Sequence, residues 1–204
     1  SGIITVTNAN NNVVASAVHR VLQLNHLNAL SNATLNLVAT AMNPVSFAAA
    51  VNAAPFNVGG LAGTAAQTLS DTAGNAVILR VGGNNSSSAF DGSLTGSGSL
   101  VKAGTGTFTL SGGNTFSGVT TINDGTLAMI GSGSLASSIS IAGSGAALDV
   151  SGVNVSSLTV AAGKVLSGIG RVNGSISMSP ASVIAPGNDD VGTLTLLADL
   201  TLNS

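Results

Sequence analysis

Residues 104–127 read GTGTFTLSGGNTFSGVTTINDGTL, and this stretch decides the fold. Polar and apolar side chains alternate in TFTL at residues 107–110, and glycines stand on both sides of the run. Such alternation is typical of a β-strand with one buried side, and the glycines mark turns. We therefore expect Phe108 and Leu110 to point inward and the two threonines between and before them to point outward.

The same alternation recurs at residues 138–142, 157–161, 174–179, 192–196 and 199–203. Short strands with turn signals at regular spacing are compatible with a sandwich, a barrel or a solenoid. Internal repeats discriminate among these three architectures.

Three segments share one plan, in which an apolar residue is followed by a Gly-x-Gly step and then by another apolar residue. These segments are residues 94–100, 127–135 and 166–172. Corner glycines favour a solenoid, because glycine adopts positive φ at little steric cost. The chain has only five Phe and no Trp or Tyr, whereas a sandwich of this size would usually bury several aromatic residues.

The composition excludes several classes of protein. The chain has 204 residues, a net charge of −2 and only 6 % charged residues, which leaves no basic surface for nucleic acid. It has no Cys, and therefore no disulfide or thiolate metal site. No apolar run is long enough for a membrane-spanning helix, and no export signal opens the chain at Ser1, so we expect any such signal to lie outside this sequence.

Glycine content divides the chain into two regions. No glycine occurs from Ile3 to Val58, and glycine is frequent afterwards. We predict that residues 1–58 form N-terminal coils or a cap that could serve in assembly, and that residues 59–204 form a β-helical repeat region continuous with it.

The first region is less regular than the second. Residues 20–24 and 33–38 are expected to be strands, and residues 25–31 are expected to form the turn between them. One helical turn is expected near residues 14–19.

At this point the residues show a family resemblance. The 104–127 stretch resembles the autotransporter-associated β-strand repeat found in the passenger domains of autotransporters and in other large bacterial surface proteins. Residues 22–35 resemble the segment that follows Gly-Thr-Leu in a preceding repeat. Residues 183–194 resemble the Ala-Pro-Gly-Asn…Gly-Thr-Leu element that closes many such arrays.

The resemblance implies an all-β, right-handed parallel β-helix that is exported to the bacterial cell surface or the extracellular space. About 20–24 residues per coil, as in the family, would give about nine coils here. The repeat itself carries no catalytic site.

Two segments have residues that are typical of ligand-binding loops. The glycines at residues 104–106 do not form a phosphate loop, because a strand is expected after them instead of a helix. Asn188, Asp189 and Asp190 lie on an expected turn and could chelate calcium, but a solvated turn is the favoured interpretation.

The titratable residues do not indicate catalysis. His19 and His26 are the only imidazoles, and no acid lies near them in the sequence. Asp91, Asp124 and Asp149 could be stacked by the coils, yet paired carboxylates can arise in this way without a catalytic role. We predict that the chain is not an enzyme and that it has no catalytic, cofactor-binding or metal-binding residue.

The sequence thus predicts an extracellular structural protein, a β-helical subunit of a self-assembling filament or matrix at the cell surface. The expected partner is a second copy, joined head to tail through the strand-like termini at residues 3–7 and 194–204. The alternative is the passenger region of an adhesin that binds cell-surface glycans, for which Phe90 and Phe116 near turns are the candidate contacts.

Overall fold

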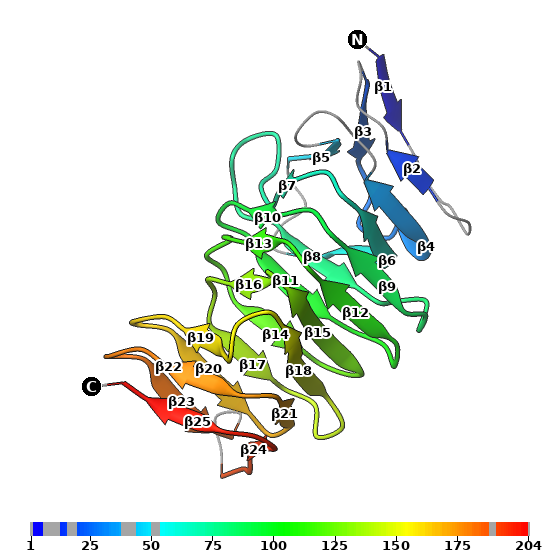
Figure 1. Cartoon of the computed structure of the whole chain (residues 1–204). Helices are drawn as coiled ribbons and strands as arrows, with labels where there is room; N and C mark the ends of the chain where they lie inside the picture. Colours follow the sequence, from blue (N-terminus) through cyan, green and yellow to red (C-terminus); the bar gives the residue numbers. More distant parts are fainter. Residues whose placement is uncertain are drawn as a thin grey trace.

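The chain folds into a stack of short strands that winds into a parallel β-solenoid of about 8 turns (Figure 1). The computed structural model describes residues 2–5, 13–15, 20–37, 44–49, 54–187 and 191–203. All ladders between its named strands are parallel. These residues contain no helix, and hence none that could cross a membrane. The predicted all-β solenoid is therefore confirmed.

Strands of successive turns stack in three series. The first comprises β8 (Ile78–Val81), β11 (Ser99–Lys102), β14 (Thr120–Ile122), β17 (Ile139–Ile141), β20 (Val165–Gly168) and β23 (Val183–Pro186). The second comprises β9 (Ser88–Phe90), β12 (Thr107–Leu110), β15 (Thr126–Gly131), β18 (Ala147–Val153), β21 (Arg171–Asn173) and β24 (Thr195–Leu196).

The third series is made of shorter sheets. In chain order it comprises β1 (Gly2–Thr5), β3 (Arg20–Leu24), β5 (Val45–Phe47), β7 (Gln67–Thr68), β10 (Leu94–Thr95), β13 (Gly113–Asn114), β16 (Ser134–Leu135), β19 (Leu158–Val160), β22 (Ile176–Met178) and β25 (Leu200–Leu202). Ladders join β1 to β3 and β5, β7 to β10, β13 to β16, and β19 to β22 and β25.

Two long strands connect the first and second series. β6 (Phe56–Gly63) pairs with β8 through its first residues and with β9 through Gly63, so both series start from this one strand. β4 (Leu30–Leu37) stacks on β6, and β2 (Val13–Ala15) stacks on β4. The glycine boundary between residues 58 and 59 falls inside β6.

The alternation of polar and apolar residues in the sequence matches the alternation of partly exposed and buried side chains in the structure. Phe108 and Leu110 are buried, whereas Thr107 and Thr109 are partly exposed, as predicted. The parallel register places Phe108 against Leu127 of the next turn. Equivalent inward positions therefore form apolar columns along the axis of the solenoid.

All five phenylalanines of the chain are buried: Phe47, Phe56, Phe90, Phe108 and Phe116. The prediction that Phe90 and Phe116 provide an adhesive surface is therefore wrong. Phe90 ends β9 in the inward phase of the alternation, paired with Leu110, so its ring lies in the core although a turn follows it.

The N-terminal region follows the predicted strands and turn where it is described, but the expected helical turn near residues 14–19 is wrong at residues 14 and 15, which lie in a strand. β3 and β4 are strands, and the residues between them form the expected turn. Val14 and Ala15 belong to β2, and residues 16–19 of the expected helical turn lie outside the described residues. The solenoid has about 8 turns instead of about nine, because some turns are long, such as the one that brings Leu166 onto Ile139.

Candidate functional site

Residues 100–129, which contain the whole stretch quoted above, lie in the middle of the solenoid and make one turn and part of the next. The segment runs from β11 through β12, β13 and β14 into β15, and β14 and β15 stack on β11 and β12. Each of these strands has a parallel neighbour in an adjacent turn. Three of the buried polar side chains of the described residues, Lys102, Asn114 and Thr120, lie in this segment.

A column of glycines shapes one corner of this turn. Gly82, Gly104 and Gly125 have φ values of 109°, 66° and 60° and follow the first-series strands of successive turns. A Cβ on Gly104 would lie 2.1 Å from the Gly82 carbonyl oxygen, and a Cβ on Gly125 would lie 2.5 Å from the Gly104 oxygen. Only glycine tolerates both this backbone conformation and this close stacking.

The Lys102 ammonium group satisfies carbonyl groups at the same corner. Its Nζ donates to the carbonyl oxygens of Ala103 at 2.7 Å, Gly104 at 2.7 Å and Asp124 at 3.1 Å. An ammonium group has three donors, and this arrangement provides an acceptor for each. The last of these acceptors belongs to the next corner along the chain, so Lys102 ties that corner to its own.

Lys102 is buried in an otherwise apolar column. It is 1 % exposed and pairs in register with Val81 on one side and Ile122 on the other. Burial lowers the pKa of Lys102 to about 8, and the Asp124 charge partly opposes this shift. The amine is therefore a structural group that points into the protein.

The sequence contains a signal for this lysine. In β11, Leu100 and Lys102 are both buried and alternate with half-buried residues, so the lysine occupies a position where the alternation requires an apolar side chain. A charge in such a position indicates that polar backbone groups lie within its reach.

Two buried amides also bind backbone groups. Asn114 accepts from the Leu94 amide at 3.0 Å and donates to the carbonyl oxygens of Gly112 at 2.8 Å and Ser134 at 3.1 Å, which links three turns. Gln67 donates to Val45 O at 2.9 Å and accepts from Val45 N at 3.1 Å. These contacts replace ladder hydrogen bonds where the third series is short.

The three aspartates that the coils could have stacked, Asp91, Asp124 and Asp149, do not lie in register with one another. Asp91 accepts a hydrogen bond from Ser111 Oγ at 2.5 Å, and Asp149 lies in register between Ala128 and Asn173. Asp124 lies in the corner beside Lys102 and accepts a hydrogen bond from the Gly125 amide at 2.7 Å. The pKa of Asp149 lies below its ordinary value. Burial alone would raise it, but hydrogen bonds from Ser151 and Asn173 have the larger combined effect and lower it.

The remaining candidate residues from the sequence are two histidines, the glycines at residues 104–106 and the possible calcium ligands. His26 is exposed in the turn before β4, and its Nδ1 accepts a hydrogen bond from the Asn28 amide at 3.2 Å. After Gly104 the chain enters strand β12, as expected for a corner and not for a phosphate loop. His19 and the possible calcium ligands Asn188, Asp189 and Asp190 lie outside the described residues.

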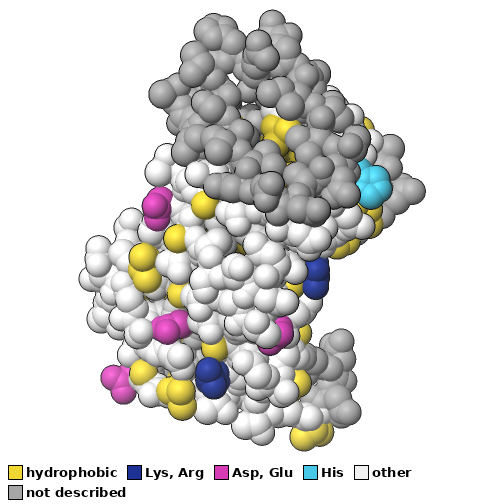
Figure 2. Space-filling model, turned by 90° about the vertical axis from the view of Figure 1, so that its right-hand side faces the viewer, with side chains coloured by type: hydrophobic (Ala, Val, Ile, Leu, Met, Phe, Trp, Pro, Cys, Tyr) yellow, Lys and Arg dark blue, Asp and Glu magenta, His cyan; other side chains and the backbone are white. Residues whose placement is uncertain are grey.

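Charged groups are sparse in the part of the chain that the structure describes. No three His, Cys, Asp or Glu side chains there form a group that could hold a metal ion. Figure 2 shows isolated charged side chains separated by uncharged surface. Hydrogen bonding by neutral groups is therefore the main polar chemistry that this surface offers.

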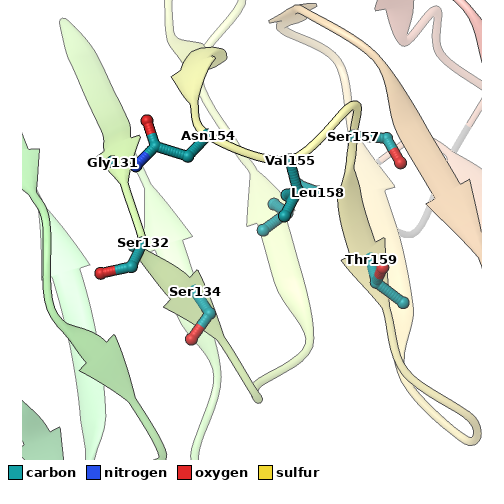
Figure 3. A pocket seen from close by; sticks show the side chains of 9 residues that line it. Gly131, Ser132, Ser134, Asn154, Val155, Ser157, Leu158 and Thr159 are labelled. Atoms are coloured by element: carbon teal, nitrogen blue, oxygen red, sulfur yellow. The ribbon is translucent and has the colours of Figure 1, made fainter.

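One pocket of about 290 Å³ opens on the flank of the solenoid. It is lined by Gly131, Ser132, Gly133, Ser134, Asn154, Val155, Ser157, Leu158 and Thr159 (Figure 3). None of these side chains is ionisable. The lining comes from two segments, the end of β15 with the turn into β16, and the loop from β18 into β19.

Comparison with known protein families identifies a repeat in this segment. The family model of the passenger-associated-transport-repeat matches residues 100–129, the segment that holds Lys102 and Asn114. No curated protein and no solved structure matches the chain. The match confirms the resemblance noted from the sequence. The chain therefore carries a passenger-associated-transport-repeat within a β-solenoid, consistent with an autotransporter passenger repeat protein, a family that implies a surface or secreted location.

Proposed function

We propose that this chain is a non-catalytic, structural part of an extracellular protein displayed on a bacterial cell. The observation that supports the proposal is the position of the matched repeat, whose inward side chains belong to the single hydrophobic core of the solenoid. The buried polar side chains support it. Lys102, Asn114 and Gln67 are engaged with backbone groups, so they stabilise the rod and are not presented to a substrate.

The finer part of the proposal is that copies of the chain assemble head to tail into a filament or matrix. The last described turn exposes apolar residues at inward positions, because Leu200 and Leu202 pair in register with the buried Ile176 and Met178. Leu202 is 72 % exposed. A further turn stacked here would cover these residues, and we propose that the first strands of a second copy supply it.

Sedimentation velocity and electron microscopy across a concentration series test the assembly. We expect ordered polymers for the wild type and monomers for the double variant Leu200→Lys and Leu202→Lys. Val119→Lys is the matched control, because Val119 is an exposed valine in another turn and should not affect polymers. A wild type that stays monomeric at every concentration would contradict the assembly proposal.

Display on the cell is tested separately. Antibodies raised against the purified chain should label intact cells of the source organism or precipitate the protein from the medium. Labelling that appears only after the cells are lysed would contradict the proposed location, whatever the assembly state.

A second candidate function is adhesion to glycans. The specific observation in its favour is the uncharged pocket between the turn into β16 and β19. The phenylalanines expected to serve this role are buried, so the pocket is the feature that this candidate depends on.

A further inference from the structure

We propose that the pocket between the 131–134 turn and β19 binds a single uncharged sugar residue. This inference rests on the adhesive candidate and gives it a site and a ligand class. Its test is a binding titration, which can fail while assembly and surface display succeed, so the failures of the two proposals are distinguishable.

The pocket lies at one of three steps at which the third series has no ladder in the described part of the chain, namely β5 to β7, β10 to β13 and β16 to β19. At the first two steps other hydrogen bonds still join the turns, from Gln67 to the Val45 oxygen at 2.9 Å and from the Thr115 amide to the Leu94 oxygen at 2.9 Å. The step from β16 to β19 has no such bond between the two strands in the described residues. The interruption leaves space between two neighbouring turns.

A local change in the backbone explains the interruption. The register between β15 and β18 shifts between Ala128 and Ile130, so β18 contains a bulge. A longer loop at residues 154–157 follows and enters β19. The Asn154 amide donates to the Gly131 oxygen at 2.7 Å, so the loop is fixed to the preceding turn at its start. Bulges of this kind re-aim side chains and are frequent next to binding sites.

The lining suits a neutral, hydroxylated ligand. Ser134 and Thr159 carry hydroxyl groups and Asn154 carries an amide, and each of these groups can both donate and accept hydrogen bonds. Sugar hydroxyls have the same dual capacity. The Ser132 hydroxyl donates to the Ser111 oxygen at 3.3 Å, so it is left as an acceptor. No lining side chain could balance the charge of a carboxylate or a phosphate, and removing such a charge from water without a partner is costly.

Apolar contact comes from Val155 and Leu158. Figure 3 shows their side chains together between the ribbon that carries Ser132 and Ser134 and the ribbon that carries Thr159. Leu158 is buried and Val155 is 65 % exposed, so together they offer the C–H face of a sugar ring a surface that is accessible from solvent.

The size of the pocket limits the ligand. Its volume of about 290 Å³ is just below the roughly 300–1,000 Å³ found for small-molecule sites. One sugar ring is therefore the expected occupant, with any attached chain extending into solvent.

Amide chemical-shift titration of the isotopically labelled full chain tests the proposal. The probes are the neutral methyl glycosides of glucose, galactose, mannose and N-acetylglucosamine, with glucuronate and glucose 6-phosphate as charged comparators. We expect at least one neutral glycoside to give saturable shifts confined to residues 131–134 and 154–159. The charged comparators should bind at least about tenfold more weakly, because their charge finds no partner.

A matched pair of variants locates the site. Val155→Asp places a carboxylate in the pocket at an exposed position and should weaken binding by at least about tenfold. Val119→Asp makes the same change at an exposed valine outside the pocket and should leave the affinity unchanged. The proposal is overturned if no neutral glycoside saturates, if the charged sugars bind as tightly, or if Val155→Asp binds like the wild type.

Discussion

Raising the pH from 7 to 10 should make this protein more stable, because Lys102 is buried as a cation. Its pKa is about 8 in the folded protein, against 10.5 for an ordinary lysine. Below pH 8 both the folded and the unfolded states hold the proton, and the cost of burying the charge is fully present. Between pH 8 and 10.5 the folded state releases its proton first, so the free energy of unfolding rises with pH.

The expected rise in the free energy of unfolding follows from the difference between the two pKa values of Lys102. A difference of about 2.5 pKa units corresponds to about 3 kcal/mol, of which about 2–3 kcal/mol should appear between pH 7 and 10. The composition of the chain makes the contribution of Lys102 easy to separate from those of other groups. The sequence has no Tyr or Cys and only two Lys, so few other groups titrate in this range.

Urea unfolding followed by circular dichroism at pH 7, 8, 9 and 10 measures this dependence. The Lys164→Met variant should show the same rise as the wild type, and the Lys102→Met variant should show little or none. A wild-type stability that is flat or falls over this range would refute the reasoning. An equal rise in Lys102→Met would assign the effect to another group.

Three further predictions concern the core, a corner and metal ions. Phe108→Asp should prevent folding, or lower the free energy of unfolding by at least about 4 kcal/mol, because it buries an unpaired charge, whereas Thr109→Asp should give the circular dichroism spectrum of the wild type. Equal effects of the two substitutions would mean that the inward and outward faces are misassigned. Gly104→Ala should lower the free energy of unfolding in urea by about 2–4 kcal/mol, because residue 104 has a positive φ and the new Cβ would lie 2.1 Å from a carbonyl oxygen. Gly145→Ala should change this free energy little, because there is open space around Gly145. The melting temperature should not change with a chelator, and a fall of many degrees would mean that Asp189 and Asp190, or groups brought together by stacking, bind a cation.

The sequence was sufficient to predict the solenoid because its signals are local. Alternation within TFTL at residues 107–110 shows which side chains point inward without knowledge of any neighbour. The corner glycines mark where each strand ends. Both signals act within a few residues, and the structure confirms them.

The polar contacts of the core could not be predicted in the same way, because they depend on which residues are stacked. Asn114 meets Leu94 and Ser134 only when turns of the observed lengths are placed in register. The prediction that Phe90 and Phe116 are available for adhesion is wrong, because a residue next to a turn can still point into the core. The pocket depends on the bulge in β18 and on the length of the following loop, which alternation does not reveal.

A spin-label distance between Ala89 and Asn173 tests the stacked solenoid most directly. Both positions lie in one column, in which Ala89 pairs with Thr109, Thr109 with Ala128, Ala128 with Asp149 and Asp149 with Asn173. The sequence has no Cys, so two introduced cysteines would be the only labelled sites. Four steps of about 4.8 Å predict a backbone separation of about 19 Å, with a narrow distribution. A broad distribution, or one centred beyond about 30 Å, would contradict a parallel stack with this register.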